Sequence, residues 1–201
     1  MITTVLFDMD GVLFDSRGAA RARFKTVLED SGFVFSLERE PIVHQGGTDR
    51  EIILGLLGEV DEATLKEMEK MAVKLSSPLK HLKINPGVAS ALEKISKTHK
   101  LAIVSNDNRK NVERKLVMFE LSDYFSAIIT ADDGIKPKPS PEPILRALEL
   151  LDEKKENAIY IGDNEVDRLA GEAAGVPTII RNNLYEDDNF FKKELFELIS
   201  S

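Results

Sequence analysis

Short apolar runs alternate along the chain with longer segments of helical periodicity, and few folds accommodate such a pattern. Residues 101–104 and 158–161 are uninterrupted apolar stretches, which is typical of parallel strands covered on both faces. Strands that alternate with helices indicate an α/β protein with a parallel, Rossmann-like sheet and helices on both faces. The predicted strands are residues 3–8, 100–105, 126–131, 158–162 and 177–181.

One connection is much longer than a crossover requires. About 75 residues follow the first strand before the next core helix begins near Gly87, whereas a crossover needs only about a dozen. The excess has helical spacing of its own, for example at Ile52, Ile53, Leu56 and Leu57. We therefore predict a core of residues 1–15 and 85–201, and a small all-α domain of residues 16–84 inserted after the first strand.

Charge and composition exclude several classes of protein. The formal net charge of -8 disfavours nucleic acid and anionic membranes as partners, because both attract clustered lysine and arginine. The sequence has no cysteine, which rules out disulfides, thiolate metal sites and cysteine nucleophiles. No apolar run approaches the roughly 18 residues of a membrane span. Without a basic start or a cleavage site before the first strand, we expect a cytoplasmic protein.

Polar residues lie at or soon after the carboxyl ends of four of the predicted strands. Since the carboxyl ends of parallel strands share one edge of an open sheet, where ligands bind, distant positions should converge on one site. The clusters are Asp8, Asp10 and Gly11; Ser105 and Asn106; Lys136 and Lys138; and Asp163 and Asp167.

Each cluster has an ordinary structural explanation when it is taken alone. Asp8–Gly11 suits a turn, Ser105 and Asn106 suit a helix cap, and acids after Gly162 suit the positive end of a helix. The lysines lie in a proline-rich loop, where lysine is commonly solvated. The four clusters together favour a site, because four carboxylates at one edge repel one another unless cations join them.

Counting charges suggests which cation that is. Four aspartates, one lysine and one divalent ion come close to neutrality, and ligation by oxygen alone favours Mg²⁺, which also accepts substrate phosphate. Such neutralisation would let a carboxylate attack a phosphate dianion and form a covalent intermediate. This hypothesis requires Asp8 and Asp163 to lie close enough to share one cation.

These clusters resemble, in order, the four motifs of the haloacid dehalogenase superfamily. The resemblance covers residues 1 to about 181 and is to the phosphatase branch with a helical cap after the first strand, which includes phosphoglycolate phosphatases and β-phosphoglucomutases. It implies a sheet order of 5-4-1-2-3. The matching segments are DMDGVLFDS from Asp8, Ser105-Asn106, KPSP from Lys138 and GDNEVD from Gly162.

The resemblance also implies a role for each matching residue. Asp8 would attack phosphorus and ligate Mg²⁺. Asp10 would be the general acid and then the base for water, with its carbonyl on the metal. Ser105 would bind the phosphoryl group, with Asn106 a weaker candidate, and Lys138 would neutralise charge. Asp163 would complete the metal site. Asp167 is a further candidate metal residue, which would orient the waters of the metal or the lysine.

The position of the lysine is open in the sequence, since Lys-Pro-x-Pro occurs in two registers that begin at Lys136 and Lys138. We favour Lys138, because Ser140 would then cap a helix that begins with Pro141 and buries Ile144, Leu145, Leu148 and Leu151.

The most distinctive segment of the insertion is HQGGTDRE, residues 44–51. Thr48 and Glu51 have the spacing of a capping box that begins a helix. Arg50, with His44 and the glycine pair that includes Gly47, is a candidate to bind a second polar group of the substrate.

We conclude from the sequence that the chain is a Mg²⁺-dependent phosphatase of a small phosphorylated metabolite, with phosphoglycolate as one candidate. A phosphotransferase like β-phosphoglucomutase is an alternative, although such relatives tend to have histidine where this chain has Ala20. A non-catalytic phospho-switch is an alternative of another class. A switch has no use for Asp10, and a metal-independent dehalogenase needs neither Asp10 nor Asp163.

Overall fold

The computed structural model of the chain describes residues 1–44, 48–75, 78–181 and 189–200. Contacts between residues divide it into two compact units. The first, the α/β unit, comprises Met1–Asp15 and Lys83–Ser201, and the second, the helical unit, comprises Ser16–Leu82.

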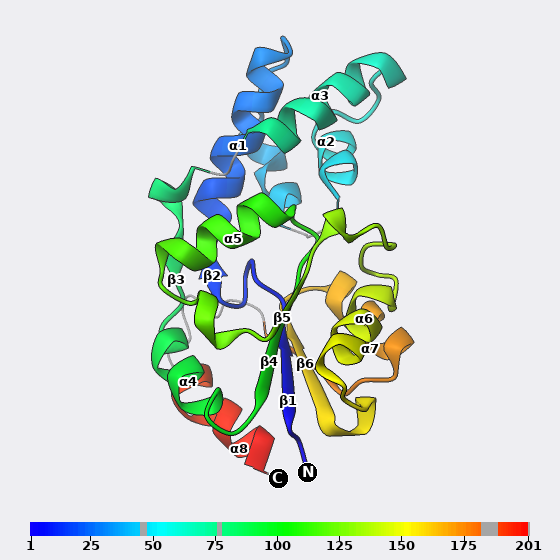
Figure 1. Cartoon of the computed structure of the whole chain (residues 1–201). Coiled ribbons are helices and arrows are strands. Elements are labelled where there is room, and N and C mark those ends of the chain that lie inside the picture. The colour runs from blue at the N-terminus through cyan, green and yellow to red at the C-terminus, as the bar shows by residue number, and fades with distance from the viewer. Residues whose placement is uncertain (45–47, 76–77, 182–188, 201) are drawn as a thin grey trace. The chain divides into compact units, whose positions relative to one another are not determined.

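A parallel sheet of five strands forms the centre of the α/β unit (Figure 1). Its strands, in the order in which they lie, are β5 (Ala127–Ile129), β4 (Lys100–Val104), β1 (Thr4–Phe7), β6 (Ala158–Gly162) and β7 (Thr178–Ile180). Numbered among themselves along the chain and read from the β7 edge, these strands have the order 5-4-1-2-3 that the family resemblance implies. The predicted Rossmann-like fold is therefore confirmed.

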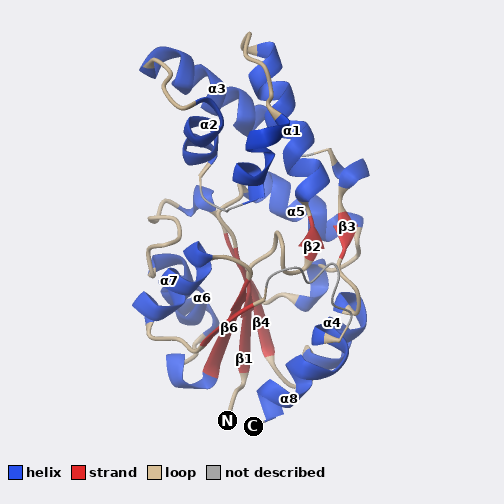
Figure 2. Ribbon diagram, turned by 180° about the vertical axis from the view of Figure 1, so that it is seen from behind, coloured by secondary structure: helices blue, strands red, loops and turns tan. Residues whose placement is uncertain are grey.

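Helices lie on both faces of this sheet (Figures 1 and 2). On one face, α6 (Glu142–Leu151) and α7 (Glu165–Ala174) bury Ile144 and Ala170 against Leu6 and Tyr160 of the sheet. On the other lie α4 (Val88–Ile95) and α8 (Leu195–Ser200), and Phe7 packs there against Phe191 with ring centroids 6.4 Å apart. The side chains of β1 thus alternate between two apolar layers, which explains its continuous apolar sequence.

Two details of α6 differ from the sequence prediction. Pro141 is the N-cap residue, one position before the helix, and the Ser140 hydroxyl accepts a hydrogen bond from the amide of Glu142 at 3.3 Å. Leu145 is 44% exposed, whereas Ala147 is buried. Ala147 is three residues after Ile144 and so shares the face formed by Ile144, Leu148 and Leu151, whereas Leu145 is turned away from it by about 100°.

The helical unit contains α1 (Arg17–Asp30), α2 (Asp49–Leu57), α3 (Glu62–Lys74) and the short 3₁₀ segments Leu37–His44 and Leu79–His81. Its apolar core is separate from that of the sheet and includes Phe24, Ile53 and Met68. The predicted capping box is confirmed. The Thr48 side chain accepts a hydrogen bond from the backbone amide of Glu51, and the Glu51 carboxylate accepts one from the backbone amide of Thr48 at 2.7 Å.

The unit boundary differs slightly from the predicted one, which placed residues up to 84 in the insertion. Strand β3 (Lys83–Ile84) pairs antiparallel with β2 (Phe14–Asp15), so Lys83 and Ile84 belong to the α/β unit. Backbone pairing between residues this far apart in sequence leaves no local signal, which explains the difference.

Within the part of the chain that the structure describes, none of the helices has the length and apolar character of a membrane span.

Candidate active site

Asp8 directly follows β1, the central strand of the sheet. Its amide continues the strand pairing by donating to the carbonyl of Ile161 at 2.8 Å, and the residue is only 6% exposed. The carboxylate is therefore held at the carboxyl edge of the sheet by regular backbone hydrogen bonds.

Lys138 reaches this carboxylate from the loop before α6. Its ammonium lies 2.6 Å from Asp8 Oδ1, 2.6 Å from Asp167 Oδ1 and 3.0 Å from the carbonyl oxygen of Val104. The side chain is 4% exposed. Burial alone would lower the pKa of Lys138, but the charges of Asp167 and Asp8 outweigh it and raise the pKa, so the lysine is a cation.

Asp167 lies in the first turn of α7 and is fully buried. Oδ1 accepts hydrogen bonds from Lys138 and, at 2.6 Å, from the Tyr160 hydroxyl, while Oδ2 accepts the amide of Asp163 at 3.1 Å. Burial raises its pKa, but Lys138 and these hydrogen bonds reverse that effect and lower it below the usual range. Asp167 is thus an ionised partner for Lys138 at neutral pH.

Asp163 completes a cluster of carboxylates. Asp8, Asp163 and Asp167 each offer an oxygen within 4.8 Å of the others. The loop after β1 approaches Asp163 so closely that a Cβ on Gly11 would lie 1.8 Å from Asp163 Oδ2, and Gly11 has φ +85°. Only glycine permits this approach.

The cluster carries an excess of negative charge, and this tests whether a cation fits. Burial, opposed by Lys138 and supported by the charge of Asp167, raises the pKa of Asp8 to about 7. Burial and the charges of Asp8 and Asp167 raise the pKa of Asp163 to about 8. Three carboxylates and one ammonium leave two negative charges, which one divalent cation would balance. The oxygen donors of Asp8 and Asp163 thus fit Mg²⁺.

Asp10 does not belong to this cluster. Its carboxylate accepts hydrogen bonds from Lys115 of α5 (Arg109–Met118), with Nζ 2.8 Å from Oδ1 and 2.6 Å from Oδ2. The carboxylate is about one-third exposed, whereas the lysine is buried. The predicted convergence therefore holds for three of the four aspartates, and the fourth has a cation of its own.

Ser105 and Asn106 follow β4, which pairs with β1. Ser105 is buried, and its hydroxyl oxygen accepts the amide of Asp107 at 3.1 Å. Asn106 bonds the backbone of Lys138 twice, donating to its carbonyl and accepting its amide, both at 2.9 Å. This pair of bonds fixes the loop that carries the lysine, so positioning is a better explanation for Asn106 than the predicted substrate contact.

The predicted site residues that remain are Lys136, Arg50 and Gly47. Lys136 is exposed and bonds Glu142 through its amide at 3.0 Å. Arg50 belongs to the helical unit and forms ion pairs with Glu62 at 2.7 Å and Glu69 at 3.1 Å. Gly47 is outside the described residues. Substrate binding by Arg50 and Gly47 stays a prediction.

Sequence reasoning missed Tyr160 and Lys115. Tyr160 lies inside a continuous apolar strand, and the sequence pattern there is that of an ordinary core residue. Its hydroxyl nevertheless donates to Asp167 and accepts from Lys138 at 2.9 Å. Lys115 did leave a signal: it occupies the apolar face of a helix, between Val112 and Leu116, where a lysine is out of place.

Comparisons with known proteins show the family of this chain. Residues 5–180 match the family model described as haloacid dehalogenase-like hydrolase. The chain is 32% identical over 177 residues to the phosphoglycolate phosphatase of Aquifex aeolicus, covering 88% of this chain and 83% of that protein. It is 30% identical over 181 residues to the pyrophosphatase PpaX of Bacillus cereus, covering 88% and 82%.

Solved structures have the same fold. A subfamily IA hydrolase of this superfamily from Geobacter sulfurreducens has a TM-score of 0.75 at 29% identity, covering 90% of this chain and 89% of that one. CbbY from Rhodobacter sphaeroides, solved with phosphate, has a TM-score of 0.76 at 23% identity, covering 92% and 88%, which shows the fold alone. From the family model, the relatives and the site together, we conclude that this chain belongs to the haloacid dehalogenase-like hydrolase family.

Proposed function

We propose that this enzyme hydrolyses small phosphate monoesters with Mg²⁺, through a phospho-aspartate on Asp8. The observation that carries the proposal is the buried contact of Lys138 with Asp8 and Asp167. An ammonium 2.6 Å from a carboxylate oxygen offsets the repulsion between that carboxylate and a phosphate dianion. The same ammonium is held in place by Asp167 at 2.6 Å and by the Tyr160 hydroxyl at 2.9 Å.

Each residue then has a defined task. Asp8 Oδ attacks phosphorus and the ester bond to the leaving oxygen breaks, while Asp10 gives a proton to that oxygen. Asp10 then takes a proton from the water that attacks the phospho-aspartate, which returns Asp8 and releases phosphate. Ser105 and Lys138 bind the phosphoryl oxygens during both steps.

Asp8, Asp163 and the backbone carbonyl of Asp10 would hold Mg²⁺. A bound Mg²⁺ supplies charge neutralisation for the phosphoryl group and the attacking carboxylate. Asp167 was also a predicted metal ligand. Its two oxygens already accept hydrogen bonds from Lys138, Tyr160 and backbone amides, so we assign it to orienting the lysine.

The name of the Aquifex relative makes phosphoglycolate the first substrate to test, and the name of PpaX adds inorganic pyrophosphate. The two could be separated by measuring kcat/KM for phosphoglycolate, pyrophosphate, glucose phosphates and p-nitrophenyl phosphate, with Mg²⁺ and with EDTA. We expect monoester hydrolysis that EDTA abolishes and that Mg²⁺ restores. Activity that persists in EDTA would contradict the metal dependence.

Two variants test the covalent mechanism. Asp8→Asn should abolish turnover, and Asp10→Asn should accumulate a phosphorylated chain visible by intact-protein mass spectrometry after mixing with p-nitrophenyl phosphate. A phospho-switch would show Asp8 phosphorylation with little change in Asp10→Asn. Release of an isomerised sugar phosphate in place of inorganic phosphate would indicate the phosphotransferase alternative.

A further inference from the structure

Asp10 is held by a buried lysine that the mechanism above does not use. The Lys115 side chain is 3% exposed, and its ammonium contacts both oxygens of Asp10 and, at 2.9 Å, Oδ2 of Asp107. An ammonium has three N–H donors, and three carboxylate oxygens surround this one. The lysine is therefore fully hydrogen-bonded by two acids that lie 97 residues apart in sequence.

The second acid is itself held rigidly. Asp107 Oδ1 accepts the amide of Asn108 at 2.8 Å and the Asn111 side-chain amide at 2.9 Å. These bonds tie Asp107 to the start of α5, the helix that carries Lys115. Because Asp107 is fixed to the start of this helix, its Oδ2 holds the Lys115 ammonium in a defined position beside Asp10.

Placing a lysine here opposes the packing preference of the helix. Its neighbours on the buried face are Val112 and Leu116, both almost completely buried. Burial by itself lowers the pKa of Lys115, but the charges of Asp10 and Asp107 outweigh it and raise the pKa above the ordinary value. The cation thus persists in the protein interior because it has these two partners.

Asp10 depends on this contact for its orientation. Because both of its oxygens accept hydrogen bonds from one ammonium, the Asp10 carboxylate is held in one orientation. It lies outside the group formed by Asp8, Asp163 and Asp167. Proton transfer in an ester cleavage requires the donor oxygen within hydrogen-bond reach of the leaving oxygen. The placement of this carboxylate should therefore matter most for esters whose leaving oxygen needs a proton.

We propose that Lys115, braced by Asp107, is a positioning residue that sets where the Asp10 carboxylate lies and so governs how well the enzyme cleaves esters with poor leaving groups. The inference rests on the acid role of Asp10 under the proposed function. Alkyl phosphates depend on protonation of the leaving oxygen, whereas p-nitrophenolate departs readily without it. Loss of Lys115 should therefore reduce cleavage of alkyl phosphates much more than cleavage of p-nitrophenyl phosphate.

The test compares kcat/KM for an alkyl phosphate, phosphoglycolate, with kcat/KM for p-nitrophenyl phosphate in the presence of Mg²⁺. Lys115→Met alone leaves two neighbouring acids without a cation and is at risk of misfolding. The double variant Lys115→Met with Asp107→Asn removes one of those charges and retains the acceptor oxygen for Asn108. In this double variant we expect kcat/KM to fall on the order of 10²-fold for phosphoglycolate and less than about threefold for p-nitrophenyl phosphate.

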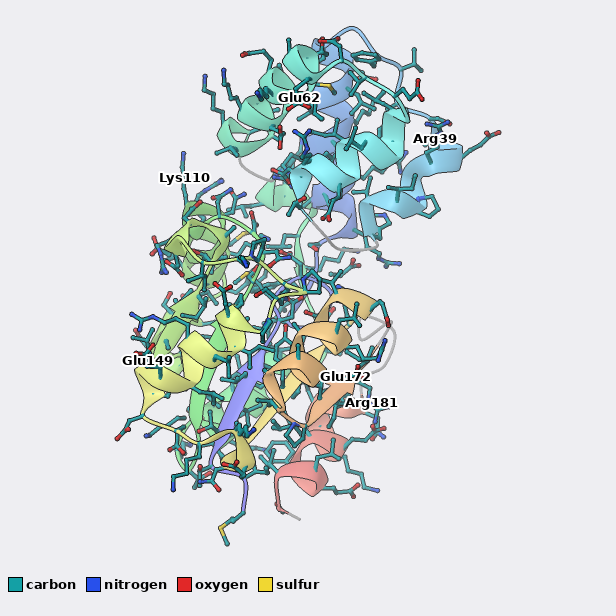
Figure 3. All side chains as sticks on the ribbon, turned by 90° about the vertical axis from the view of Figure 1, so that its right-hand side faces the viewer. Arg39, Glu62, Lys110, Glu149, Glu172 and Arg181 are labelled. Carbon is teal, nitrogen blue, oxygen red and sulfur yellow. The ribbon has the colours of Figure 1, made fainter. Side chains whose placement is uncertain are left out.

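Two controls complete the design. Lys110→Met changes an exposed lysine on the same helix (Figure 3) and should leave both values unchanged. In an Asp10→Asn background, the double change should cause no further loss on phosphoglycolate, since the group that it positions is already gone.

The outcomes separate the two proposals. An equal loss on both esters, or no loss on either, would overturn the role of Lys115 while leaving the phosphatase proposal intact. A further loss in the Asp10→Asn background would also overturn it. If the wild-type enzyme hydrolysed neither ester with Mg²⁺, the proposed function itself would fail, and this inference with it.

Discussion

The ion pairs of two lysines of the α/β unit, Lys138 and Lys115, differ in burial from those of Arg50 in the helical unit. Lys138 and Lys115 are 4% and 3% exposed, and each contacts two carboxylates. Arg50 of the helical unit also contacts two carboxylates but is 39% exposed. An exposed pair is screened by water and contributes little, whereas a buried ion needs every partner it has. The comparison teaches that burial marks the pairs around β1 as parts of a site.

The first prediction tests the most buried pair and should give the largest effect. Lys138→Met leaves Asp8 and Asp167 facing each other without a cation, so we expect turnover to fall by about 10³-fold or more. Loss of one partner of a buried pair should also lower the free energy of unfolding by ~3–5 kcal/mol. Steady-state kinetics and urea unfolding would measure both. Lys136→Met, in the same loop but exposed, is the control, and an equal effect there would reverse the assignment of the lysine.

The second prediction concerns the acids that have no complete counter-charge in the absence of metal. Asp8 and Asp163 have folded-state pKa values of about 7 and about 8, above the ordinary 3.8. Between the ordinary pKa of 3.8 and these raised values, the folded protein binds more protons than the unfolded chain. The stability of the fold is therefore lost as the pH rises through this range. In EDTA, the thermal midpoint should fall between about pH 5 and about pH 8.5.

The same experiment has an internal control. Asp163→Asn removes one titrating group, and its midpoint should fall less steeply with pH than that of the wild type. Mg²⁺ should stabilise the wild type more at the upper end of the range than at the lower end, because protons and the cation compete for the same oxygens. A midpoint in EDTA that rises with pH would contradict the placement of these acids.

A third, smaller effect should come from the hydroxyl of Tyr160. Tyr160→Phe retains the buried ring but removes a donor to Asp167 and an acceptor for Lys138. We expect the free energy of unfolding to fall by about 1–2 kcal/mol and kcat by roughly tenfold, with KM little changed. Tyr124→Phe, on a residue outside this network, should change neither quantity. A KM effect without a kcat effect would argue that Tyr160 acts on substrate binding instead.

The smallest effect on stability should come from Arg50. Because its ion pairs with Glu62 and Glu69 are exposed, Arg50→Ala should leave the thermal midpoint almost unchanged. If Arg50 binds a polar group of the substrate, KM for the best ester should rise several-fold while kcat stays constant. Glu62→Gln, which weakens the ion pair but keeps the arginine, serves as the matched variant. An unchanged KM in Arg50→Ala would end the substrate-binding hypothesis.

Much of the fold could be predicted because its signals are local. Continuous apolar runs identified the strands, and helical spacing identified the insertion, since burial on two faces or on one stripe leaves a pattern in consecutive residues. Parallel strands share a carboxyl edge, so the meeting of Asp8, Asp163 and Asp167 also followed from the strand assignments.

The choice of partners within that edge depended on tertiary structure. Asp10 follows the same strand as Asp8, yet it turns to Lys115, 105 residues away, because of where α5 places that lysine. Asn106 forms hydrogen bonds with the backbone of Lys138, and Tyr160 joins the network of Lys138 and Asp167 through its hydroxyl. Neither role leaves a pattern in the sequence. Hydrogen-bond partners are set by angles and distances between elements, which periodicity does not encode. The sequence thus defined the sheet and its acidic edge, and packing decided which cation holds which acid.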